Sequence, residues 1–120
     1  MGKKADDTVL DGLLDIIATA TEMHVCTAEP TDRANAIALE LADEVMVGGD
    51  FTNADGDTSG RKVTIAQQAS LPIDTTGTAT HIALTSATLL LYVTTCTSQA
   101  LTSGGTVTVP AFDIEVADPT

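Results

Sequence analysis

The stretch THIALTSATLLLYVTT, residues 80–95, decides the fold class of this chain. It contains two runs of threonine, aliphatic and β-branched residues, 80–85 and 88–95, and such residues favour strands. The dipeptide Ser86-Ala87 is short enough to join the two runs as a hairpin, although it lacks the usual glycine. These residues predict a β-hairpin and a mainly β domain.

Further strands are predicted on both sides of this hairpin. Candidate strands recur about every ten residues and alternate with turn signals, a pattern typical of an antiparallel β-sandwich or small barrel. In the last of them Phe112, Ile114 and Val116 face inwards, while Asp113 and Glu115 face outwards. The predicted strands are 24–28, 62–67, 80–85, 88–95, 106–109 and 112–116, and the predicted turns are 48–50, 53–57, 75–77 and 103–105.

One N-terminal helix is predicted over residues 8–21. Its aliphatic residues recur at helical spacing and form one apolar stripe, and Asp6 or Asp7 can cap its start. The segment 31–47 is ambiguous between helix and strand, and we favour a short helical turn near 32–36 followed by a strand. The chain of 120 residues is therefore expected to form a single domain, with an N-terminal arm (1–7), a helix (8–21) and a β-sandwich (22–120).

The charge of the chain limits its partners. The net charge is −12, and residues 1–60 carry most of it, with 13 acidic against 3 basic side chains. Nucleic-acid binding requires the opposite sign, so no direct DNA or RNA partner is expected. No apolar run is long enough to cross a bilayer, and no signal peptide is recognisable, which predicts synthesis in the cytoplasm and no membrane partner.

An acidic turn resembles a calcium loop only in part. Asp50, Asn53, Asp55 and Asp57 surround Gly56, but the first and twelfth EF-hand positions would then be occupied by phenylalanine and lysine. Asp-Gly turn chemistry explains the same residues without any ion. An adventitious cation is the alternative, and no metal site is predicted.

Two histidines and two cysteines complete the set of candidate ligands. His24 and Cys26 share one strand face, whereas His81 and Cys96 lie elsewhere, and the close ligand pairs of structural zinc sites are otherwise missing. Buried free thiols are the expectation for the cysteines. A Cys26–Cys96 disulfide, within or between chains, is the alternative if the protein meets an oxidising environment.

No motif of an enzyme is present. The sequence contains neither a nucleophile elbow nor a phosphate-binding loop, and the aromatic residues that usually grip sugars amount to only 2%. Arg61 and Lys62, the basic pair in the body of the chain, are expected to meet acids of the same subunit or of a partner. We expect no catalytic activity and no cofactor. A carbohydrate-binding or hydrolase sandwich module is the less favoured alternative.

Four stretches resemble a group of small virion proteins of tailed bacteriophages. They read GDTSGRKVT (56–64), GTATHIAL (77–84), LYVTTC (91–96) and PAFDIEV (110–116), and the likeness extends over about residues 8–119. These stretches carry fold patterns and no catalytic signature. The resemblance implies a β-sandwich subunit within a phage particle.

Among such proteins, a capsid decoration (cement) protein is the role we favour. The resemblance implies that it binds the outer surface of the capsid, with the major capsid protein and copies of itself as partners, often as a trimer. It would stabilise the shell against internal pressure. The alternative is a neck, tail or fibre-base subunit. A Cys26–Cys96 cross-link between neighbouring subunits is a further hypothesis for the released particle.

Overall fold

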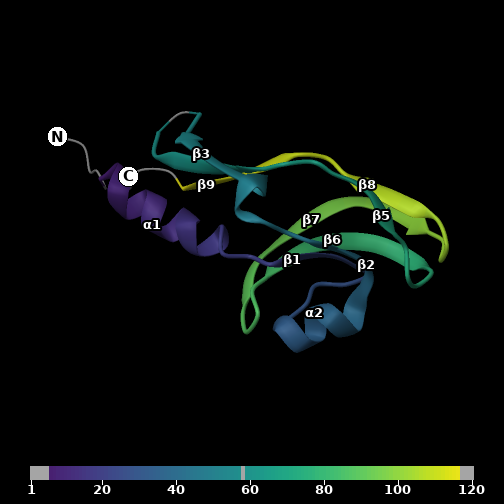
Figure 1. Ribbon diagram of the computed structural model, residues 1–120. Coiled ribbons are helices and arrows are strands. Elements are labelled where there is room, and N and C mark those ends of the chain that lie inside the picture. The colour runs from purple at the N-terminus through teal and green to yellow at the C-terminus, as the bar shows by residue number, and fades with distance from the viewer. Residues whose placement is uncertain (1–5, 58, 117–120) are drawn as a thin grey trace.

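The computed structural model describes residues 6–57 and 59–116 and shows a mainly β protein with antiparallel sheets (Figure 1). Its helical elements are α1 (Asp7–Ile17), α2 (Arg33–Leu39) and the 3₁₀ turn η1 (Gly48–Asp50). Its strands are β1 (Glu22–Cys26), β2 (Glu40–Val45), β3 (Phe51–Asp55), β4 (Arg61–Ile65), β5 (Gln68–Pro72), β6 (Gly77–Thr85), β7 (Leu90–Leu101), β8 (Thr106–Val109) and β9 (Phe112–Val116). The predicted fold class is thus confirmed.

The strands form three sheets around one core. The largest has the order β2-β1-β6-β7, a second has the order β3-β4-β9, and β5 pairs with β8. A single bridge between Ala42 and Ile73 joins the β5 end to the β2 edge of the large sheet. All three sheets and α1 contribute aliphatic side chains to the main hydrophobic cluster, which includes Leu14, Met23, Ile65, Leu71, Leu84, Val107 and Ile114. The sheets are therefore layered over a shared interior, as in a sandwich.

The hairpin predicted at residues 80–95 is present as β6 and β7. Its loop is longer than expected, because Ser86 N–H bonds to the Leu89 carbonyl (2.9 Å) and the Ser86 hydroxyl accepts the N–H groups of Thr88 and Leu89. The strands are also longer than predicted. Near the far end Ala79 pairs with Gln99 but His81 pairs with Thr95, so three residues of β7 lie opposite one residue of β6. This bulge bows the outer edge of β7.

Helix α1 ends four residues earlier than predicted. Asp6 caps its start by accepting the Thr8 N–H (2.9 Å), as expected. The predicted C-terminal part, residues 18–21, has left the helix, because Thr21 already donates its N–H to the Thr85 carbonyl (2.8 Å) beside β1. Sheet pairing therefore overrides helical propensity there. The predicted arm, residues 1–7, lies outside the described residues except for Asp6, the cap, and Asp7, the first helical residue.

Two other predictions of local structure were wrong in extent. The turn predicted over 53–57 is shorter than expected, because Asn53, Ala54 and Asp55 belong to β3 and pair with β4. The predicted helical turn near 32–36 is a full helix, α2, capped by Asp32 through the Asn35 N–H (2.7 Å). The protein therefore has a second short helix that the predicted class did not include.

The molecule is elongated. Its principal extents are 54 × 26 × 25 Å and its radius of gyration is 15.2 Å, compared with about 13.6 Å for a compact chain of this length. Figure 1 shows why: α1, β3 and β9 lie at one end, while the hairpin β6–β7, the β5–β8 ribbon and α2 lie towards the other. The long shape leaves much surface available to neighbours.

Candidate functional site

One buried polar network stands out within the described residues. His24 and Thr85, both fully buried, are the polar or charged side chains in the interior there. The His24 Nδ1 atom is hydrogen-bonded to the Glu40 carboxylate, and Nε2 lies 2.8 Å from the Thr85 hydroxyl. In the tautomer with the proton on Nδ1, that atom donates to the Glu40 carboxylate, and Nε2 accepts the proton of the Thr85 hydroxyl.

Strand register brings these residues together. His24 lies in the middle of β1, which pairs with β2 on one side and with β6 on the other. Glu40 is the first residue of β2, and Thr85 is the last residue of β6, opposite Glu22. The imidazole therefore connects three neighbouring strands of the large sheet through their side chains.

Further carboxylates surround the histidine. Glu22 Oε2 lies 3.8 Å from Nε2, and Asp43 is the direct β2 partner of His24 in the strand pairing. Burial raises the pKa of Glu40, against the opposing effect of its hydrogen bond to His24. Burial and the nearby charge of Asp74 raise the pKa of Asp43. The site is thus a buried imidazole at an edge of the sheet that carries three carboxyl groups, those of Glu22, Glu40 and Asp43.

The hydroxyl–imidazole–carboxylate order has the connectivity of a nucleophilic triad. A nucleophile must also reach its substrate, and the Thr85 side chain has no solvent exposure. Neither His24 nor Thr85 lines the two pockets between β7 and β8 that are described below. The geometry therefore favours a structural role, in which the network fixes the relative positions of β1, β2 and β6.

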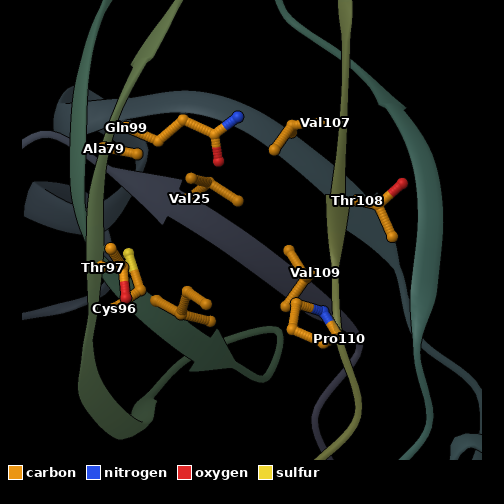
Figure 2. Close-up of a pocket in the computed structure, with 10 residues that line it drawn as sticks. Val25, Ala79, Cys96, Thr97, Gln99, Val107, Thr108, Val109 and Pro110 are labelled. Atoms are coloured by element: carbon orange, nitrogen blue, oxygen red, sulfur yellow. The ribbon is translucent and has the colours of Figure 1, made fainter.

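Two adjoining pockets lie between β7 and β8, and Figure 2 shows residues that line the first of them. Their volumes are ≈ 230 Å³ and ≈ 350 Å³, and they share Ile82, Cys96, Thr97, Val109 and Pro110. Figure 2 shows Val25 between the strand that carries Cys96 and the strand that carries Val109. The ionisable groups that line these pockets are Cys96 and, in the second, Asp113. They are apolar recesses without groups arranged for acid–base chemistry.

The acidic residues considered for calcium are each used by the protein itself. Asp55 bonds to Arg61 (2.6 Å), Asp57 bonds to Lys62 (2.8 Å), and Asn53 donates to Asp15 (3.1 Å). Asp50 accepts the Val47 N–H (2.9 Å). The structure therefore does not bring these oxygens together around a cation. Across residues 6–57 and 59–116 it contains no group of three or more metal-binding side chains.

The residues considered for zinc are also separated. His24 is bound in its network, and His81 Nδ1 lies 2.9 Å from the hydroxyl of its neighbour Thr80. Both cysteines are free. Cys26 is buried beside Ala36 and Ala83, and burial raises the pKa of its thiol to about 12; Cys96 packs against the main core. The two thiols lie in different clusters, so no Cys26–Cys96 bond is present, and only Cys96 is accessible to another subunit.

Arg61 and Lys62 meet acids of the same subunit. Arg61 Nε lies 2.8 Å from Asp11, so it connects β4 to α1, and Lys62 Nζ lies 3.5 Å from Asp113. The hydrogen bond to Asp11 raises the pKa of Arg61, and the hydrogen bond to Asp57 raises the pKa of Lys62. The pairs are accessible to water and contribute modestly to stability, yet they fix the side of α1 that faces the sheet.

The remaining observations do not identify a family. In comparisons with protein-family models, with curated proteins and with solved structures, no match to this chain was found. Within the described residues, none of the helices has the length and apolar character required to span a membrane. The function must therefore be argued from the residues and their arrangement.

The acidic edge around His24 predicts how stability depends on pH. Because the pKa values of Glu40 and Asp43 are raised in the folded state, the folded chain binds protons more tightly than the unfolded chain in the range just above their ordinary values of 4.5 and 3.8. The free energy of unfolding should therefore increase as the pH is lowered from 7 towards that range, and fall as the pH rises again.

Denaturant unfolding at several pH values tests this expectation. Asp113 acts in the opposite sense, because its bonds to Thr64 and Lys62 lower its pKa and their contribution is lost in stronger acid. The variant Asp43→Asn should show a smaller gain in stability on mild acidification than the natural chain. A stability that rises steadily with pH through the same range in both proteins would contradict the assignment.

Proposed function

We propose that this protein is a structural subunit of a tailed-phage virion, a capsid decoration protein that binds the outer surface of the shell and stabilises it. The observation that carries the proposal is an exposed apolar face on α1, which consists of Val9, Leu13 and Ile16. The protein that carries this face is elongated and acidic. Such a combination suits a protein that works by contact with other protein surfaces.

The positions of the four phage-like stretches support this proposal. They fall on β4 with its preceding turn, on β6, on the first half of β7 and on β9. These strands belong to the two larger sheets, so the likeness concerns the elements that define the fold. The buried His24 network adds a rigid tie between strands, which is useful in a subunit that must keep its shape under load.

The proposed mechanism is thermodynamic linkage. A protein that binds the assembled shell and not its separated subunits shifts the equilibrium towards the shell in proportion to its occupancy. Each contact can be weak, because many copies bound by symmetry act together. The acidic surface favours a docking site on the shell that carries basic side chains. The expected partners are the major capsid protein and copies of this chain.

The composition of purified particles tests the proposal. Quantitative mass spectrometry should find this chain in mature virions and in heads separated from tails, in a copy number that scales with the capsid subunits. Particles that lack it should lose their DNA at a lower temperature. A chain retained only on tails would overturn the decoration role in favour of a neck, tail or fibre-base subunit, and a chain missing from virions would overturn a virion role altogether.

A further inference from the structure

The outer face of α1 carries three aliphatic side chains that the protein does not cover. Val9, Leu13 and Ile16 are 62%, 51% and 57% exposed, and their i, i+4, i+7 spacing places them along one line, here called the outer stripe. They adjoin the inward-facing residues Leu10, Leu14 and Ile17. At 3.6 residues per turn the six side chains span about 160° of the helix, more than the roughly 100° typical of a helix that faces one core.

Charged groups are turned away from the outer stripe. Asp11 bonds to Arg61 (2.8 Å) and Asp15 accepts from Asn53 (3.1 Å), and both partners lie on the sheet below the helix. The stripe therefore carries no charge in a chain whose net charge is −12. The net charge opposes the approach of a second copy, and the outer stripe is a part of α1 on which the two copies would meet without bringing charged side chains into contact.

Gly12 lies beside the outer stripe, near its midpoint. A Cβ atom placed there would meet nothing within 4 Å, so no contact inside the protein requires a glycine. Glycine weakens a helix interior relative to alanine, and no close packing at this position requires its small size. It leaves a shallow gap on the exposed side of α1, which a side chain from another molecule can occupy.

We propose that α1 pairs with α1 of a second copy of this chain, antiparallel and across a two-fold axis. An axis through the midpoint of the stripe, between positions 12 and 13, places Val9 opposite Ile16 of the other copy. The same axis places Leu13 over Gly12 of the other copy, where the missing side chain makes room. Because the stripe is uncharged and complementary to itself, the contact is isologous and closes as a dimer.

The pairing of two copies adds a contact between subunits to the proposed structural role. The area that the contact buries indicates how stable the dimer is. One helix face falls short of the roughly 800 Å² that each partner buries in a standard interface, so the isolated dimer should be weak. On a shell, neighbouring copies are held at high effective concentration, and weak pairing then becomes significant. Only this effect on the shell rests on the proposed function. The dimer itself can be measured in solution.

Sedimentation velocity of the full chain, from micromolar to millimolar concentration, tests the pairing. We expect a concentration-dependent monomer–dimer equilibrium. Leu13→Lys should raise its dissociation constant on the order of tenfold or more, because it places a charge in the contact. Leu89→Lys, a matched control at a 59% exposed leucine in the β6–β7 loop, should leave the dissociation constant unchanged.

Gly12→Ala provides a second variant whose two effects have opposite signs. It should raise the melting temperature of the dilute monomer, because alanine is the better helix former, and it should weaken the dimer, because its methyl group fills the gap that receives Leu13. A purely local role of Gly12 would change the melting temperature alone.

Two results would overturn the pairing. One is a natural chain that stays monomeric up to millimolar concentration; the other is a dimer that both Leu13→Lys and Gly12→Ala leave intact. A monomeric chain that is nevertheless abundant on phage heads would overturn the pairing and leave the decoration role standing. A dimer formed by a chain that is missing from virions would do the reverse.

Discussion

Replacing His24 by leucine is expected to lower the free energy of unfolding by about 3 kcal/mol and the melting temperature by on the order of 10 °C. Leucine is similar in size, so the change removes the polar network without opening a large cavity. It leaves the Thr85 hydroxyl, fully buried and 2.8 Å from the histidine, without that partner, and it removes the hydrogen bond to Glu40. Denaturant unfolding followed by circular dichroism measures the loss.

Two comparisons isolate the network from other effects of the substitution. His81→Leu is the matched control, because His81 is half-buried and its described side-chain hydrogen bond is to the hydroxyl of adjacent Thr80. This variant should lower the free energy of unfolding by less than about 1 kcal/mol. Adding Thr85→Val to His24→Leu should recover part of the loss, since no buried hydroxyl then lacks a partner. Equal losses for His24→Leu and His81→Leu would refute the structural role of the network.

Leu14→Ala should destabilise the protein by about 2–5 kcal/mol. Leu14 is fully buried and belongs to the main cluster, where it connects α1 to the interior of the sheets. Truncation removes apolar contacts and leaves a cavity that the surrounding strands cannot fill completely. The measurement is chemical unfolding at low protein concentration, where the chain is monomeric.

The neighbouring residue provides the control for this prediction. Leu13 has the same side chain and sits one position earlier in α1, but it is 51% exposed on the outer stripe. Leu13→Ala should therefore cost less than about 1 kcal/mol, since little buried area is lost. If the two variants were equally destabilised, the orientation of α1 on the sheets would be wrong.

Strand positions could be predicted where alternation or β-branched runs were strong. The hairpin at residues 80–95 and the strand 112–116 are of this kind, and Ile114 is buried while Asp113 and Glu115 are exposed, as predicted. The end of β7 could not be predicted, because the run from Thr97 to Ala100 is polar or small. Its strand conformation comes from pairing with β6, a tertiary effect.

The direction of the apolar stripe on α1 could be predicted only in part. Helical spacing identified the residues of the stripe, but it could not show that the sheets cover Leu10 and Leu14 and leave Leu13 outside. The same orientation brings Asp11 to Arg61 on β4, fifty residues away. An ion pair between residues so far apart in the chain cannot be predicted from the local sequence.

The His24–Glu40–Thr85 network could not be predicted from the sequence for a similar reason. The spacing of His24 and Cys26 predicted that both lie on one strand face, and burial does not distinguish the faces of β1, because Met23 and Val25 are buried as well. The partners of His24 are 16 and 61 residues away, and nothing near Glu40 or Thr85 marks them as its neighbours. Only the register of β2 and β6 against β1 brings the three together.

The bulge at the outer edge of β7 has a consequence for aggregation. A long, straight, threonine-rich strand at the margin of a sheet is a template on which identical molecules stack into fibres. Three β7 residues facing one β6 residue break the regular spacing of the free amide and carbonyl groups, so an incoming strand cannot form a continuous ladder. At high concentration the chain should thereby resist stacking into fibres through this strand.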